Sequence, residues 1–137
     1  MKGFFNKILR INLREKTFQE ESVPDSIFEA FLGGKGLGSY LLIKENPLGV
    51  DPLSPRNRLI FSLGPVTDSR IYGSCRHGAF TKSPLTGILS ESYSGGKAAE
   101  PMSRTGYDPF IFEEAAAEPV WIEISVQKVF FHDAKDL

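Results

Sequence analysis

The glycines of this chain are concentrated in its middle. Twelve of the 13 glycines fall between Gly33 and Gly106, and the total exceeds the average share of about 7%. Glycine adopts left-handed backbone freely and lets another backbone or a ligand approach closely. The segments on either side are poor in glycine and rich in residues that suit strands. We therefore expect the middle of the chain to be shaped around tight turns or around a ligand.

Short strands account for most of the hydrophobic pattern. Residues 7–13 and 17–23 are joined by a polar turn, which predicts an opening hairpin with Leu9, Ile11 and Leu13 on one half-buried face. The further expected strands are 58–63, 74–82, 88–93, 110–113, 120–126 and 129–132. The strands at 74–82 and 88–93 are expected to pair as a second hairpin. About eight strands without strict alternation with helices indicate an α+β fold whose sheet is mostly antiparallel or mixed.

Two or three short helices complete the expected fold. Ser26 and Glu29 form a capping-box pattern at the start of the first helix, and Gly33 is placed to end it in a left-handed cap. The second helix is expected to run to about Glu45, before a proline, and a third covers about 97–104. No repeat or linker divides the sequence, so residues 1–137 are expected to form one domain.

Composition excludes several classes of protein. Sixteen basic and 17 acidic residues leave a net charge of −1, which argues against nucleic acid as a partner. The single cysteine, Cys75, rules out a disulfide framework and any all-cysteine metal or iron–sulfur site within the chain. No apolar run approaches the ~20 residues needed to cross a membrane, and no signal peptide is evident. A cytoplasmic location is the default expectation.

Three glycine-rich segments could carry function. Residues 32–38 place glycines and a lysine at a helix N-terminus, where backbone N–H groups can bind an anion, although a tight helix–helix turn is the commoner explanation. Residues 73–78 set Arg76 among small residues, and an arginine there can bind a phosphate or carboxylate or simply be exposed. Residues 92–97 place two glycines between a strand and a helix. Since no nucleophile or acid–base pair accompanies these segments, they suit a surface that binds a large anionic ligand better than a self-contained catalyst.

The sequence resembles the N-terminal domain of the tungsten-containing aldehyde ferredoxin oxidoreductases. The matching segments follow the family's order over nearly the whole chain: 8–13, 31–37, 40–42, 50–57, 63–67, 81–87, 94–96 and 106–108. The most specific of these is the Thr-Lys-Ser-Pro-Leu-Thr-Gly sequence at 81–87. Each segment alone is a weak signal, and their agreement in order makes coincidence improbable.

The resemblance implies a set of cofactor-binding residues. In that family this domain is the base on which a tungsten bis-pyranopterin cofactor lies, and Arg76 is expected to contact the pterin phosphates. Tyr93 stands where family members carry asparagine, and its backbone carbonyl is expected near a magnesium ion that bridges the phosphates. Gly95 is expected to approach the cofactor, and Ser94 and Gly96 belong to the same loop. No catalytic residue and no side-chain metal ligand is expected within the chain.

The resemblance also implies partners and limits. The cofactor is tungstopterin or molybdopterin with magnesium, whereas the 4Fe-4S cluster and the substrate pocket belong to later domains that pass electrons to ferredoxin. The family's N-terminal domain is a pseudo-twofold duplication, and this chain corresponds to part of it, about one half. We therefore expect a cofactor platform for missing catalytic domains or a separate subunit, without catalytic competence of its own. The alternative is a stand-alone binding or scaffold module, in which a homodimer replaces the second half.

Overall fold

The computed structural model describes residues 2–137, which form three helices and eight strands. The helices are α1 (Asp25–Phe31), α2 (Gly34–Glu45) and α3 (Ala99–Arg104). The strands are β1 (Lys7–Asn12), β2 (Thr17–Ser22), β3 (Leu59–Leu63), β4 (His77–Lys82), β5 (Leu89–Ser94), β6 (Pro109–Glu113), β7 (Val120–Ile124) and β8 (Val129–Asp133). The elements expected from the sequence are all present, with ends that differ by a few residues.

Six strands form one sheet in the order β2-β1-β6-β3-β4-β5, and β7 and β8 form a separate antiparallel pair. Within the sheet β1 and β6 run parallel, and all other neighbours run antiparallel. The expected α+β class and both expected hairpins, β1–β2 and β4–β5, are confirmed. The position of β6 between β1 and β3 is a long-range feature that local patterns do not contain.

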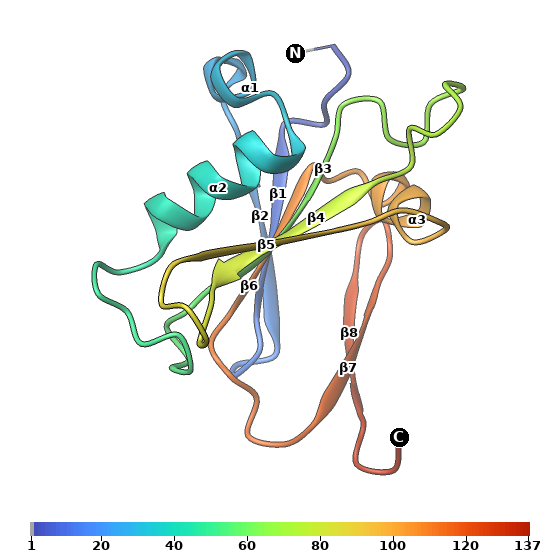
Figure 1. Cartoon of the computed structure of the whole chain (residues 1–137). Coiled ribbons are helices and arrows are strands. Elements are labelled where there is room, and N and C mark those ends of the chain that lie inside the picture. Colours follow the sequence, from blue (N-terminus) through green and yellow to red (C-terminus); the bar gives the residue numbers. More distant parts are fainter. Residues whose placement is uncertain (1) are drawn as a thin grey trace.

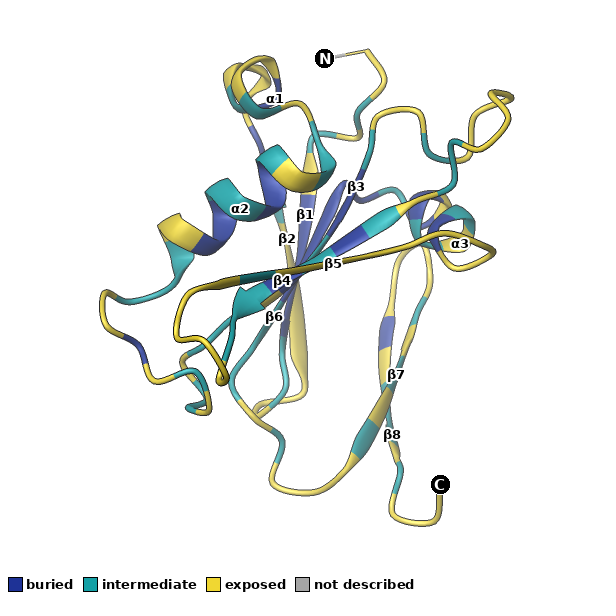
Figure 2. Ribbon diagram, in the orientation of Figure 1, coloured by how far each residue is buried: buried dark blue, intermediate teal, exposed yellow. Residues whose placement is uncertain are grey.

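Different elements lie on the two faces of the sheet, and the second face is covered only in part (Figure 1). Helices α1 and α2 lie on one face, over a core cluster of Ile8, Val23, Phe28, Leu37, Leu41, Leu42, Ile60, Phe80 and Ile111. Helix α3 and the β7–β8 hairpin lie on the other, where the buried cluster is Leu9, Ile11, Leu63, Ala99, Tyr107, Phe110 and Val129. Buried residues concentrate in the inner strands and on the sheet-facing side of α2 (Figure 2). No helix in the described part of the chain is long and apolar enough to cross a membrane.

Strand β1 is buried on both faces, although its alternation predicted a half-buried strand. Leu9 and Ile11 lie on the expected face, and Ile8 packs under the helices. Arg10, on that helix-covered face, is only 9% exposed. The prediction was wrong because α1 and α2 cover one face of β1, and α3 and the β7–β8 hairpin cover the other.

Arg10 is compensated by three carboxylates from different elements. Its Nε donates to Glu21 Oε1 at 2.6 Å, and its Nη1 lies 3.1 Å from Glu45 Oε2 and 3.2 Å from Glu113 Oε2. The hydrogen bonds with Glu21 raise the pKa of the Arg10 guanidinium above its usual value and lower the pKa of the Glu21 carboxyl. The cluster therefore joins β1, β2, β6 and the end of α2 at one buried cation.

The α1–α2 junction departs from the expected capping. The residue that caps α1 is Pro24, without a side-chain hydrogen bond, so the capping box that begins at Ser26 does not form. Leu32, with φ 56°, takes the left-handed position that Gly33 was expected to occupy. Gly33 is extended instead, and a Cβ there would lie 2.7 Å from the carbonyl oxygen of Leu63. Its glycine is explained by close approach to the end of β3.

The other glycines of this segment also serve packing. A Cβ at Gly36 would overlap the carbonyl of Phe31, and one at Gly38 would overlap the ring of Phe80. These contacts draw the helices against each other and draw α2 onto the sheet. The tight-turn interpretation of residues 32–38 is confirmed, and glycine content alone gives no support for an anion site there.

Candidate functional site

The β4–β5 pairing brings the predicted cofactor-binding residues together. Arg76 directly precedes β4 and Ser94 ends β5, and His77 pairs with Ser94 across the two strands. A Cβ placed on Gly95 would lie 4.0 Å from Arg76 Nε. The Cys75 Sγ donates a hydrogen bond to the Gly96 carbonyl at 2.7 Å, which ties the two loops. Arg76, Tyr93, Ser94, Gly95 and Gly96 thus share one end of one hairpin, and their binding role stays a prediction.

Arg76 has no carboxylate partner among residues 2–137. Arg104, at the end of α3, by contrast donates to both oxygens of Asp68 at 2.8 Å each. Arg76 is exposed, and no ion pair within the described chain involves it or Lys97 in the adjoining loop. The N–H groups of Gly95 and Gly96 likewise have no acceptor within residues 2–137. These donors leave a local positive surface on a chain that is near neutral overall.

The Tyr93 side chain is engaged on the α2 side of the sheet. Its ring packs edge-on against Phe80 at 6.0 Å between centroids, and its hydroxyl donates to Glu91 Oε2 at 3.1 Å. Glu91 also accepts from Lys35 Nζ at 2.7 Å. Desolvation, followed by the Glu91 contact, raises the pKa of the Tyr93 phenol. The Tyr93 hydroxyl is therefore already bonded, and the ligand contact expected of this residue is through its backbone carbonyl.

A hollow of about 310 Å³ opens beside Arg76, and we call it the glycine hollow. Its lining residues are Gly34, Ser62, Gly64, Val66, Thr67, Gly73, Ser74, Arg76, His77, Gly78 and Tyr93. Arginine is the only permanently charged residue in this set, and no Asp or Glu lines the hollow. The walls come from the start of α2, the end of β3, the loop before β4 and the end of β5. The hollow is therefore built by the glycine-rich middle of the sequence.

Two lining residues carry buried polar atoms without a partner, and the sequence analysis did not single out either as a ligand contact. Ser62 Oγ and His77 Nδ1 are both buried and have no hydrogen-bond partner within residues 2–137. An unsatisfied buried polar group costs about 1–3 kcal/mol, so such groups need an explanation. Ser62 is the one polar residue in the otherwise apolar strand Leu59–Leu63. This polar residue in an apolar strand was the only sign in the sequence of a special role for Ser62.

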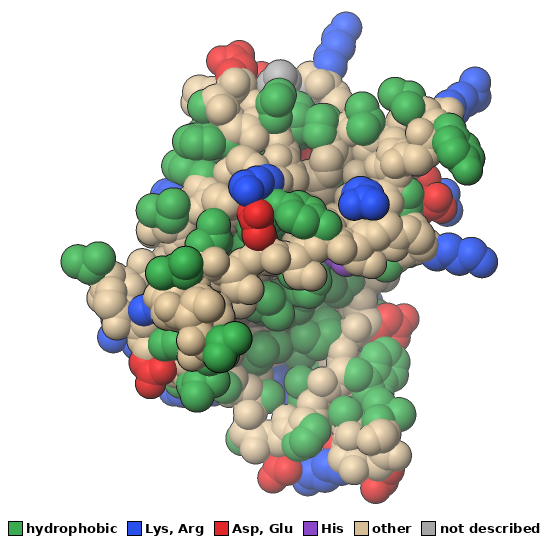
Figure 3. Space-filling view, in the orientation of Figure 1, with side chains coloured by type: hydrophobic (Ala, Val, Ile, Leu, Met, Phe, Trp, Pro, Cys, Tyr) green, Lys and Arg blue, Asp and Glu red, His purple; other side chains and the backbone are tan. Residues whose placement is uncertain are grey.

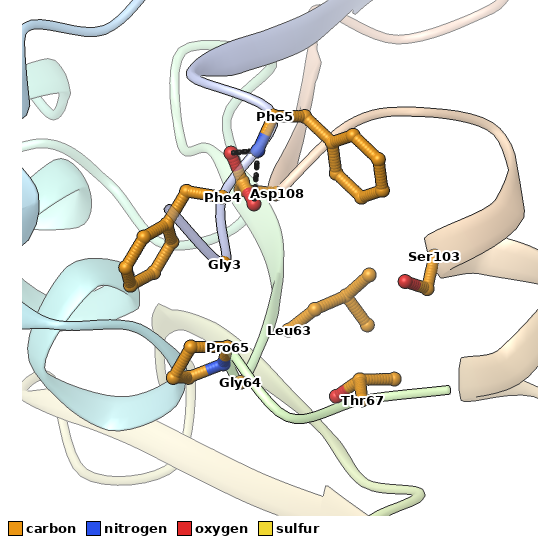
Figure 4. Close-up of a pocket in the computed structure, with 9 residues that line it drawn as sticks. All are labelled: Gly3, Phe4, Phe5, Leu63, Gly64, Pro65, Thr67, Ser103 and Asp108. Atoms are coloured by element: carbon orange, nitrogen blue, oxygen red, sulfur yellow. Dashed lines mark hydrogen bonds between the residues drawn. The ribbon is translucent and has the colours of Figure 1, made fainter. Parts of the chain in front are cut away.

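A second hollow, of about 270 Å³, lies on the other side of the Gly64–Thr67 loop (Figure 4). Asp108 closes one end of it and accepts the backbone N–H of Phe5 at 3.0 Å and of Asn6 at 2.8 Å. Burial raises the pKa of the Asp108 carboxyl despite these hydrogen bonds. Because both oxygens already accept N–H groups, Asp108 serves to anchor the segment before β1.

The family model of the aldehyde ferredoxin oxidoreductase N-terminal domain matches residues 8–137. This chain belongs to that family. The match covers almost the whole sequence, so it includes every element of the sheet and both loops of the candidate site. The resemblance inferred from eight short segments is confirmed.

The similar curated proteins are named as oxidoreductases. The tungsten-containing aldehyde ferredoxin oxidoreductase of Pyrococcus horikoshii is 40% identical over 98% of this chain and 22% of its own length. The tungsten-containing aldehyde ferredoxin oxidoreductase of Pyrococcus furiosus is 36% identical over 100% of this chain and 23% of its own length. The aliphatic sulfonate oxidoreductase WOR-like subunit of Pyrococcus furiosus is 30% identical over 98% of this chain. This chain spans about a fifth of the length of these curated relatives.

A solved structure shares the fold in detail. The active site complex BamBC of benzoyl coenzyme A reductase, in complex with 1,5-dienoyl-CoA, superimposes with a TM-score of 0.93 at 30% identity. The superposition covers 97% of this chain and 20% of that chain. The arrangement of sheet and helices is therefore common to proteins whose names describe different reactions, as expected when function depends on the site rather than the fold.

Proposed function

We propose that this domain binds the phosphate end of a tungsten- or molybdenum-pterin cofactor in an aldehyde:ferredoxin oxidoreductase. The observation that carries the proposal is Arg76, an exposed guanidinium without a carboxylate partner in the described chain, beside a Gly95–Gly96 loop whose N–H groups are free. Family membership and the tungsten-containing relatives supply the cofactor class.

The donor set fits a phosphate-bearing group. A guanidinium binds a phosphate through two parallel N–H···O bonds, and free backbone N–H groups add neutral donors. The absence of acidic side chains in the lining removes like-charge repulsion. Within residues 2–137 no group of three His, Cys, Asp or Glu side chains could hold a metal ion.

Each residue then has a distinct role. Arg76 neutralises and orients a phosphate, Gly95 and Gly96 donate N–H groups to it, and Ser94 sets the end of β5 from which the loop departs. The Tyr93 backbone carbonyl would be the contact to a magnesium ion bound with the phosphates, a role that does not need its side chain. The bound cofactor supplies the redox chemistry of aldehyde oxidation. Cys75 is the only cysteine of this sequence, so an iron–sulfur cluster serving ferredoxin takes its ligands from elsewhere in the enzyme.

The open part of the second sheet face favours a second candidate function, a binding module that pairs with another copy. Hydrophobic side chains gather in a hollow between β5 and the β7–β8 hairpin (Figure 3). The hydrophobic residues of this face that are only partly buried include Leu13, Phe61, Phe112, Ile122, Ile124 and Phe131. A second copy of the chain would cover this face around a twofold axis. Light scattering that finds only monomer at micromolar concentration would contradict the dimer.

Metal and pterin analysis tests the first function. The chain is purified anaerobically from cells that make pterin cofactors, together with any partner subunit, and its tungsten, molybdenum and pterin contents are measured. We expect stoichiometric pterin in the wild type and a loss of at least fivefold in Arg76→Ala. Arg70→Ala is the matched control, because Arg70 is also exposed and unpaired in the described chain, but it does not line the hollow. Absence of pterin in the wild type, or equal losses in both variants, would overturn the proposal.

A further inference from the structure

A further hollow, of about 220 Å³, lies at the end of the β4–β5 hairpin that is opposite to Arg76. Its walls come from the end of α2, from the loop that follows α2, and from the turn between β4 and β5. We call it the aliphatic hollow, because the residues that line it include Ile43, Leu48, Val50, Ile88 and Leu89. Lys82 pairs with Leu89 at this end of the hairpin, whereas His77 pairs with Ser94 at the other. The aliphatic hollow is therefore separate from the proposed cofactor site.

Several side chains of the aliphatic hollow are open to solvent. Ile43 is 78% exposed, Ile88 is 68% exposed, and Leu48 is fully exposed. These residues come from three different segments, and Figure 3 shows hydrophobic side chains on the surface around the end of α2 and the β4–β5 turn, on the left of the molecule. Exposed apolar side chains that the fold gathers from separate segments are typical of a binding surface. The walls of the hollow are thus available to an apolar ligand.

Among the described residues, Lys82 is the only charged one that lines the aliphatic hollow. Its Nζ donates to the carbonyl of Val50 at 2.5 Å, and no carboxylate within residues 2–137 forms an ion pair with it. Asp51 follows Val50 in the chain, but its Oδ1 accepts the backbone N–H of Leu53. An ammonium group has three N–H donors, so two remain after the bond to Val50. A partly buried cation beside apolar walls is stabilised when an anion lies against it.

We propose that the aliphatic hollow binds an aliphatic carboxylate, the anion of a short-chain or medium-chain fatty acid. The hydrocarbon chain packs against Ile43, Leu48 and Ile88, and the carboxylate accepts the remaining N–H donors of Lys82. The apolar walls alone would accept any apolar molecule, and the ammonium alone would accept any anion. Together they select a ligand that is apolar along its length and negative at one end. The site does not depend on the proposed cofactor role.

An NMR titration of the 137-residue chain with sodium octanoate, at constant ionic strength, tests the site. We expect saturable shifts of the backbone amides of Gly49, Val50 and Ile88, and at least fivefold weaker binding of octanol, which has the same chain without the charge. One fully buried methylene strengthens binding about fourfold, so about twofold per methylene is expected from butyrate to octanoate against these partly exposed walls. Shifts that do not saturate, or equal affinities for octanoate and octanol, would overturn the proposal.

Three variants separate the charge from the walls. Lys82→Met keeps an unbranched side chain and removes the ammonium, so it should weaken octanoate binding at least fivefold and leave octanol binding within twofold. Lys44→Met is the matched control, because Lys44 lies in the last turn of α2 but does not line the hollow, and it should bind octanoate within twofold of wild type. Ile88→Ser should weaken the binding of both ligands.

The same variants supply the results that would contradict the site. Full octanoate affinity in Lys82→Met, or equal losses in Lys82→Met and Lys44→Met, would overturn the role of Lys82. Octanoate binding that is unchanged in Ile88→Ser would overturn the role of the walls. If Lys82→Met does not fold, as judged by circular dichroism, the comparison of octanoate with octanol in the wild type still decides the proposal.

Discussion

Replacing Arg10 with methionine should lower the free energy of unfolding by about 3 kcal/mol at neutral pH. Removing one partner of a buried ion pair costs about 3–5 kcal/mol. The Arg10 side chain is 10% exposed, and those of Glu45 and Glu113 are 19% and 17% exposed. The lower end of the range applies because Glu21 is 36% exposed and Glu113 keeps Arg58 at 3.4 Å. Against a total stability of about 5–15 kcal/mol, the variant stays folded.

The destabilisation should shrink in acid. Arg10 holds the folded-state pKa of Glu21 below its ordinary 4.5, so this pair contributes fully above that pH and is lost as pH falls through the lower value. Urea unfolding followed by circular dichroism, at neutral pH and at about pH 3, measures both quantities. Arg14→Met, which removes a 64% exposed arginine paired with Glu114 at 3.2 Å, should change stability by less than about 0.5 kcal/mol. An Arg10→Met loss below about 1 kcal/mol, or one that is independent of pH, would refute the reasoning.

Two further changes probe packing and titration. Gly38→Ala should destabilise the chain by about 1–3 kcal/mol in thermal unfolding, because its Cβ overlaps the Phe80 ring. Gly95→Ala should stay within about 0.5 kcal/mol, because its Cβ meets nothing closer than 3.6 Å, and equal losses in the two would contradict the packing argument. Burial and the hydrogen bond to Glu20 raise the pKa of Tyr107 to about 12. The contribution of the Tyr107 hydroxyl to stability is present below about pH 10 and is lost toward pH 12. The free energies of unfolding of wild type and Tyr107→Phe, measured in urea, should therefore converge toward about pH 12. A difference that stays constant with pH would contradict the raised pKa of Tyr107.

Local signals account for the parts of the fold that were predicted correctly. The β1–β2 and β4–β5 hairpins follow from alternation and nearby turns, and the start and end of α2 follow from glycine and proline. The β1–β6 pairing could not be predicted, because it joins residues about a hundred positions apart without a distinctive local pattern. The prediction that Gly33 ends α1 in a left-handed cap was wrong for a related reason. Contact between Gly33 and Leu63, distant in sequence, decided which residue turns left-handed.

The candidate site shows the same division. Arg76 and the Ser94–Gly96 loop were found because small residues around an arginine are visible in one short segment, and the hairpin then brings them together. Ser62 was missed because the sequence does not show whether a serine in an apolar strand has a hydrogen-bond partner, and only the structure shows that its hydroxyl has none within residues 2–137. The glycines of residues 33–38 resemble an anion-binding loop in sequence. In the structure, close contacts with Phe31, Leu63 and Phe80 explain why glycine stands at three of these positions.

The late position of β6 gives this domain a defined order of assembly. Strands β1 and β2 can pair as a hairpin early, and strands β3, β4 and β5 can pair with one another early. These two groups of strands are not connected by any pairing until β6 enters between β1 and β3. During synthesis the edges of both groups stay unpaired until Glu113 has emerged from the ribosome. Closing so long a loop is slow, and the waiting strand edges are exposed to other chains. Strand β6 therefore joins the two halves of the sheet. Substitutions within it should slow folding more than equally destabilising substitutions in the β7–β8 hairpin.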